Sequence, residues 1–279
     1  MASLQSRAMF LAVAAFSAGC ITFEQQTVSY RHDPGRDVLL VQIVYSGIHG
    51  DATHESGVGV TTPGLTEVEQ ADLVEAVRGN QIYLFDSWLP VFDLDALCLE
   101  LAERAYGAPD EAELARREFW RLLAANVRIS NGPFYLDGQG RLSAVQHIRI
   151  TNLGAVVRSA NRFWAVETEA LLMEAPEWEP AARIDQPVQF VGNQLILRYP
   201  AGEEVPGQRR WLDAGVLKVA DGVATLTLGS PTASRVTFVT PSAGRYVGNA
   251  VEFVRQHFGL DAGFDPKADA DALFGWTRR

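Results

Sequence analysis

The chain has 279 residues, of which 47% are apolar and 21% are charged, a composition typical of globular proteins. Lysine and arginine contribute 24 positive charges and aspartate and glutamate 34 negative ones, so the formal net charge is −10. An acidic chain without a basic cluster repels phosphate backbones, which excludes nucleic acid as an expected partner. A chain of this length can bury a hydrophobic core without metals or disulfides, in one domain or in two.

Residues 1–20 have the pattern of a signal segment. Arg7 precedes the apolar stretch AMFLAVAAF, and the small residues SAG follow it before Cys20. This stretch has about half of the ~20 residues that a transmembrane helix needs, which favours a cleaved signal peptide. The segment resembles a bacterial lipoprotein signal, in which small residues precede a cysteine that is lipidated before cleavage. Ala18, Gly19 and Cys20 match that pattern, whereas Ser17 stands where an aliphatic residue is usual.

The resemblance implies that Cys20 carries acyl chains and anchors the protein to a membrane of the bacterial cell envelope. Several chains at ~0.8 kcal/mol per buried methylene would hold a soluble domain at the membrane surface. Two other interpretations stay open: SAG is an ordinary secretory cleavage site, or Cys20 is buried in an N-terminal helix. The second cysteine, Cys98, lies in a stretch with helical spacing and is expected to be a buried thiol outside any disulfide framework.

The first half of the chain alternates hairpins and helices. Two apolar stretches, 27–32 and 37–45, flank the turn signal DPGR and predict a hairpin whose second strand is buried on both faces. A glycine-rich loop, 46–64, follows. Thr66 and Glu69 then form a capping box for a helix that we expect to end at Gly79.

The next expected elements continue this alternation. The sequence predicts an extended aromatic segment (81–92) and two amphipathic helices (94–106 and 110–126). A second hairpin around DGQG (132–152) and a third long helix (153–173) follow. Residues 174–187 are acidic, contain three prolines and have no periodicity, so they are the best linker candidate.

Beyond this linker the chain again favours antiparallel strands. The dipeptides GN and DG predict hairpins at 188–199 and 215–228, followed by a strand at 235–240 and a helix at 245–258 that ends before Gly259. Antiparallel hairpins interspersed with amphipathic helices indicate an α+β fold. The expected organisation is a signal peptide at 1–20, an α+β domain at 21–173, the linker at 174–187, and a smaller α+β domain, or a continuation of the same one, at 188–279.

The loop at 46–64 holds the densest group of metal-ligating residue types. His49, Asp51, His54 and Glu55 fall within seven residues, and imidazole with carboxylate suits zinc or another divalent metal. Their spacing matches no common zinc motif, and HESGV lacks the second histidine of H-E-x-x-H. The alternative interpretation, which we favour, is a solvated polar loop.

Two functions are consistent with these patterns. Nucleophile-elbow, phosphate-loop and dinucleotide-binding motifs are absent from the sequence. The favoured hypothesis is therefore a membrane-anchored envelope lipoprotein with a non-catalytic domain that binds or scaffolds, needs no cofactor, and has an unknown envelope protein or glycan as its partner. The alternative is a metal-dependent hydrolase that uses the loop from His49 to Glu55.

Overall fold

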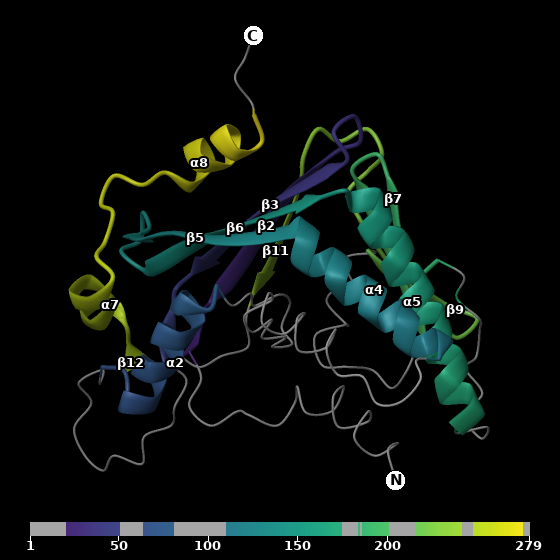
Figure 1. Ribbon diagram of the computed structural model, residues 1–279. Helices are drawn as coiled ribbons and strands as arrows, with labels where there is room; N and C mark the ends of the chain where they lie inside the picture. The colour runs from purple at the N-terminus through teal and green to yellow at the C-terminus, as the bar shows by residue number, and fades with distance from the viewer. Residues whose placement is uncertain are drawn as a thin grey trace.

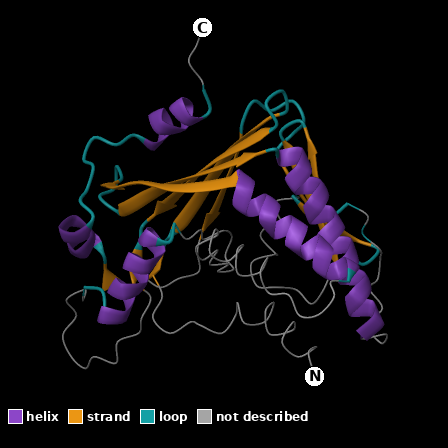
Figure 2. Cartoon of the chain, in the orientation of Figure 1, coloured by secondary structure: helices purple, strands orange, loops and turns teal. Residues whose placement is uncertain are grey.

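The structure is a computed structural model that describes residues 21–50, 64–80, 110–174, 184, 186–200, 216–241 and 248–275. Within these residues it has five helices and 12 strands, and the strands form three antiparallel sheets (Figures 1 and 2). The α+β fold predicted from the sequence is therefore confirmed. Cys20, Cys98 and the elements expected at 81–106 lie outside the described residues.

A five-stranded sheet runs through the middle of the molecule, with the strand order β11-β2-β3-β6-β5 (Figure 1). Its strands are β2 (Gln25–Asp33), β3 (Val38–Ser46), β5 (Val127–Leu136), β6 (Leu142–Thr151) and β11 (Val236–Pro241). The predicted hairpins around DPGR and DGQG are the pairs β2–β3 and β5–β6. Strand β11 comes from the chain beyond the linker candidate and completes the sheet by pairing with β2.

The central strand, β3, is buried on both faces, as its continuous apolar sequence predicts. Leu39, Val41, Ile43 and Tyr45 alternate along one face and belong to the main core. Val44 points to the other face, where it forms a smaller apolar cluster with residues of β5 and β6. Because both faces of β3 exclude water, the sheet needs a covering layer on each side.

Strand β5 begins earlier than the sequence predicted. The expected strand started at Gly132, but β5 pairs with β6 from Val127 onward. The register shifts between Asn131 and Phe134, around Gly132 and Pro133, as in a β-bulge. Proline has no N–H to donate to a neighbouring strand, so it is found in edge strands such as β5 and at bulges. The bulge displaces the end of β5 relative to β6.

Helices α2 (Glu67–Arg78) and α7 (Val251–His257) cover one end of the main core face (Figure 1). At the other end, α4 (Glu111–Asn126) leads directly into β5, and α5 (Leu153–Glu174) leaves β6 after one residue. The two long helices pack against each other, with the rings of Phe119 and Phe163 stacked at 5.1 Å. The three helices predicted at 66–80, 110–126 and 153–173 are thus confirmed.

A four-stranded sheet packs against the same core. Its strand order is β7-β8-β10-β9. The strands are β7 (Val188–Val191), β8 (Gln194–Pro200), β10 (Val223–Leu228) and β9 (Leu217–Ala220). Both predicted hairpins are present. Asp221 and Gly222 have φ angles of 50° and 72°, which is the left-handed pair that a two-residue hairpin turn requires.

Tyr30 of β2 joins the two sheets. Its hydroxyl lies 3.0 Å from the carbonyl oxygens of both Asn193 and Leu228, in the four-stranded sheet. Burial raises the pKa of the Tyr30 hydroxyl to about 12, so the group stays protonated and donates throughout the neutral range. The two sheets are therefore connected by a buried hydrogen bond as well as by apolar packing.

Helix α8 (Pro266–Leu273) covers the second face of the five-stranded sheet and was not predicted from the sequence (Figure 1). Asp265 caps its N-terminus by accepting a hydrogen bond of 2.9 Å from the N–H of Lys267. On the sheet side, the Asp269 carboxylate accepts a hydrogen bond of 2.7 Å from Gln42 Nε2 and lies 2.6 Å from His147 Nε2. The helix is thus attached to the sheet through polar groups.

The capping box of α2 is present as predicted. The N–H of Glu69 donates to Thr66 Oγ1 at 3.1 Å, and the N–H of Thr66 donates to Glu69 Oε2 at 2.8 Å. The Thr66 hydroxyl also donates to the same carboxylate, at 2.9 Å. Glu69 is only 1% exposed, so its carboxylate has little access to water and needs hydrogen bonds from the protein. The bonds from Thr66 supply them.

Replacing Thr66 with alanine should lower the free energy of unfolding by about 1 kcal/mol, the usual cost of a lost N-cap. Urea denaturation followed by circular dichroism measures the change. Val68, 57% exposed in the same turn, provides the control, since Val68→Ala should change the stability by less than about 0.5 kcal/mol. Equal effects of the two substitutions would show that the cap does not stabilise the helix.

Candidate functional site

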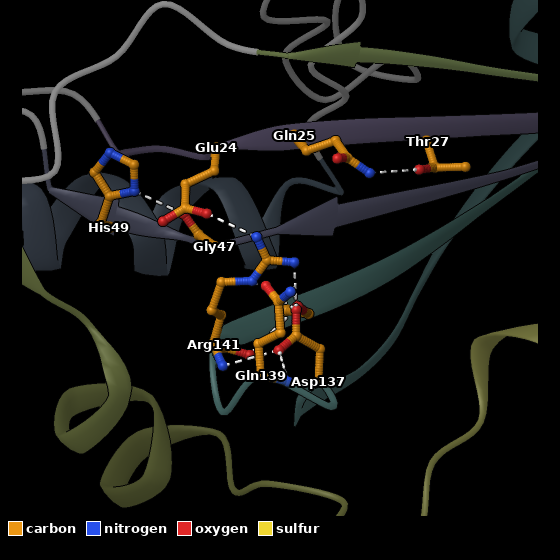
Figure 3. A network of polar contacts seen from close by, with 9 residues as sticks. Glu24, Gln25, Thr27, Gly47, His49, Asp137, Gln139 and Arg141 are labelled. Carbon is orange, nitrogen blue, oxygen red and sulfur yellow. Dashed lines mark hydrogen bonds and ion pairs between the residues drawn. The ribbon is translucent and has the colours of Figure 1, made fainter.

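His49, the first of the predicted metal ligands, lies in a strand and not in an open loop. Strand β4 (His49–Gly50) pairs on one side with β1 (Ile21–Thr22) and on the other with β12 (Gly248–Asn249). The imidazole is 1% exposed, and its Nδ1 lies 2.6 Å from the carbonyl oxygen of Gly47 (Figure 3). His49 is thus part of a small buried sheet that joins three distant segments of the chain.

The bond to Gly47 defines the tautomer of a neutral His49. A carbonyl oxygen only accepts, so Nδ1 carries the proton and Nε2 carries the lone pair. Metal-ligating histidines use this arrangement. Asp51, His54 and Glu55 lie outside the described residues, and among the residues that are described no three His, Cys, Asp or Glu side chains form a metal-binding cluster. The metal site at 49–55 therefore stays a prediction.

Helix α2 approaches β4 very closely at Gly50. A Cβ atom at this position would overlap the buried carboxylate of Glu69, so any larger residue would have to displace that hydrogen-bonded side chain. Glu69 thus has two structural roles, because it caps α2 and it lies against β4. This contact fixes the position of α2 over the end of the five-stranded sheet.

An ion-pair network fixes the neighbouring β5–β6 turn (Figure 3). Arg141 binds Glu24 Oε2 and Asp137 Oδ2, each at 2.8 Å, and Asp137 Oδ1 also accepts from the N–H of Gln139 at 2.9 Å. Burial alone would raise the pKa of Asp137, but the hydrogen bonds from Arg141 and from the backbone outweigh it and lower the pKa. The network connects the turn to Glu24, which follows β1.

A partly open cavity of about 250 Å³ lies between α2 and the end of the five-stranded sheet. Its walls come from β1, β3, β6, the bulge of β5, α2 and the residue that follows α7. Aromatic and aliphatic side chains form most of the surface, among them Phe23, Tyr45, Ile48, Leu73, Phe134 and Phe258. Small residues face the space as well, including Ala76 and Ala144. This arrangement of a concave apolar surface is typical of a ligand site.

Three polar side chains of the cavity, Tyr45, Gln146 and Asn131, are bonded in a row. The Tyr45 hydroxyl donates to Gln146 Oε1 at 3.0 Å, Gln146 Nε2 donates to Asn131 Oδ1 at 2.9 Å, and Asn131 Nδ2 donates to the carbonyl of Val77 at 2.6 Å. The chain of bonds leads from buried Tyr45 to Asn131, which is exposed. It therefore fixes the exposed Asn131 amide, and the rest of the surface is mostly apolar.

The described lining of the cavity has one ionisable side chain, the Tyr45 phenol, and its hydroxyl is bonded to Gln146. Among the described residues that line it there is no Asp, Glu, His, Cys, Lys or Arg. Nucleophilic and general acid–base catalysis most often use such side chains. What this surface can do is exclude water from an apolar group of a ligand, with the exposed amide of Asn131 bonded to the buried amide of Gln146.

The low pKa of Asp137 predicts a pH-dependent contribution to stability. A carboxyl whose folded pKa is lowered stabilises the fold above its unfolded pKa of about 3.9, and this contribution is lost as the pH falls through the folded value. Asp137→Asn should therefore cost about 1 kcal/mol at pH 7 and progressively less below about pH 4.

Urea denaturation of both proteins between neutral and acidic pH measures the difference. Asp221→Asn, in the β9–β10 turn, controls for the loss of one negative charge and should change the stability at pH 7 by less than about 0.5 kcal/mol. A constant difference between wild type and Asp137→Asn at every pH would contradict the assignment.

The metal hypothesis predicts about one equivalent of divalent metal per chain in protein purified without chelator. Combined substitution of His49 and His54 by alanine should remove it, as elemental analysis would show. His257→Ala is the control, because this exposed histidine in the last turn of α7 bonds to the carbonyl of Phe253. Protein that contains no metal, and takes up none when zinc or manganese is added, would disprove the hypothesis.

The chain matches no family model, no curated protein and no solved structure. No helix in the described part of the chain combines the length and the apolarity that crossing a membrane requires. Two features of this chain alone therefore bear on its function. These are the cavity between α2 and the sheet, and the segment that precedes Ile21.

Proposed function

We propose that the protein is a bacterial envelope lipoprotein, anchored to a membrane through acyl chains on Cys20, whose domain binds its partner without catalysis. The cavity under α2 is the binding site. The observation that carries this proposal is the lining of the cavity, which among the described residues includes no ionisable side chain except the Tyr45 phenol. Such a surface supports binding of an apolar group, and its described residues include no carboxylate, imidazole, thiol or amine to act as a base or metal ligand.

The size of the cavity supports the same function. Its volume of about 250 Å³ exceeds the ~150 Å³ of an apolar protein cavity that binds benzene. Burying an apolar group there contributes about 0.8 kcal/mol for each methylene removed from water. A ligand of several methylene groups would thus bind measurably without any charge–charge interaction.

The chemistry of the lining also narrows the class of partner. A glycan presents hydroxyl groups, which lose their bonds to water on burial and need polar partners in the site. The side chains of exposed Asn131 and buried Gln146 already bond to each other and to Val77 and Tyr45. The cavity therefore favours the apolar part of an envelope component, such as a lipid or a protein side chain, over a sugar.

The anchor is tested by changing Cys20. Cys20→Ala should move the protein from the membrane fraction to the soluble fraction, because the acyl chains that hold it are then absent. Immunoblotting of the two fractions measures the shift, and the intact mass of the extracted wild-type protein should show acyl groups on a chain that begins at Cys20. Ser17→Ala is a neighbouring control that keeps the small-residue pattern and should stay with the membrane. An unacylated wild-type chain that begins at Met1 would contradict the proposal.

A further inference from the structure

The cavity begins where the predicted anchor ends. Ile21, Thr22 and Phe23 all line it, and Cys20 is the residue directly before Ile21. Consecutive Cα atoms are about 3.8 Å apart, so no linker separates the acylated residue from the cavity wall. A domain held by Cys20 must therefore keep this cavity beside the lipid headgroups.

We propose that the cavity takes up one acyl chain of a membrane lipid from the bilayer in which the domain is anchored. The assignment of the membrane as the source of this acyl chain rests on the proposed function. The ability of the cavity to hold an acyl chain depends on the cavity alone. The bilayer supplies acyl chains at high local concentration immediately next to the cavity, and no soluble ligand has that advantage.

The walls of the cavity suit a methylene chain. Phe23 and Tyr45 pack edge to face at 5.2 Å on one side, and Phe134 and Phe258 stack at 5.5 Å on another. Among the polar residues of the lining Asn131 is exposed, whereas Thr22, Tyr45 and Gln146 are buried. A chain that enters with its methyl end first buries its methylenes among the rings and leaves its ester or carboxyl group near the Asn131 amide and water.

The same lining predicts that the headgroup is not recognised. Among the described residues of the cavity there is no lysine or arginine to bind a phosphate, so affinity should depend on the chain and not on headgroup charge. The chains on Cys20 are a competing occupant. Withdrawing one of them into the cavity would weaken the anchor, whereas a neighbouring lipid leaves the anchor complete.

Photocrosslinking tests the proposal on the mature acylated protein in vesicles. The vesicles contain phosphatidylcholine with a diazirine in one acyl chain, and mass spectrometry locates the labelled peptides. Labels should appear in the peptides that contain Ile21–Thr22, Ala76 and Ala144. Replacing a third of the lipid with phosphatidylglycerol should leave the yield unchanged.

Two substitutions on α2 provide a matched pair. Ala76 faces the cavity and is buried, so Ala76→Leu fills the space and should lower the labelling of these peptides by about tenfold. Ala71 is exposed on the same helix, so Ala71→Leu should label like the wild type. Ala144→Leu fills the cavity from the opposite wall and replaces Ala76→Leu if that variant does not fold by circular dichroism. Equal labelling of the filled and unfilled proteins overturns the proposal.

The Cys20→Ala chain, probed in water with a diazirine fatty acid, separates the two parts of the inference. Labelling of the cavity in this chain and in the acylated protein supports the proposal. If only the Cys20→Ala protein is labelled, an acyl group on Cys20 fills the cavity of the acylated protein. This result overturns a membrane lipid as the source. Absence of labelling in both overturns the acyl-chain site. If the wild-type protein carries no acyl groups, the proposed anchor is wrong. Labelling of the Cys20→Ala protein by the diazirine fatty acid then decides whether the cavity binds acyl chains.

Discussion

The double burial of β3 is the constraint on which the rest of the structure depends. A central strand with apolar side chains on both faces must be covered twice, by α2, α7 and the four-stranded sheet on one side and by α8 on the other. The second face is only partly apolar, since Gln42 lies within it. A buried amide must be hydrogen-bonded, and α8 meets this need through the Asp269 carboxylate and the Pro266 carbonyl, 2.7 and 2.8 Å from Gln42 Nε2.

The cavity follows from how the first of these layers is built. Close-packed interiors leave few spaces larger than a water molecule, so a cavity of about 250 Å³ needs a structural cause. The small side chains of Ala76 and Ala144 face it from α2 and β6, and the bulge at Gly132 interrupts the adjacent edge strand. At the end of α2 nearest β4, the missing side chain of Gly50 leaves room for the Glu69 carboxylate.

The features that could be predicted from the sequence are those encoded by neighbouring residues. Turn signals such as DG and the capping box at Thr66 act over a few positions and gave the hairpins and α2 correctly. Helix α8 was missed because its sequence has a polar composition and lacks a clear apolar face. It nevertheless has local helix signals: Asp265 caps it, Pro266 lies in its first turn, and Gly275 has φ 71° beyond its end. The buried position of His49 and the cavity were also missed, since β1, β4, β12 and α2 meet only in three dimensions.

The attachment of β1 decides how an anchor at Cys20 would orient the domain. Strand β1 pairs with β4. Two residues after β1, Glu24 is bound to Arg141 and, through its N–H, to the carbonyl oxygens of Ser46 and Gly47 at 3.0 and 3.2 Å. These bonds hold the first described residues against β3 and the β5–β6 turn, in a defined position. A tether attached to Cys20 would therefore act on the wall of the cavity itself. The orientation of the cavity toward the membrane would then be determined by the fold and not by the conformation of a linker.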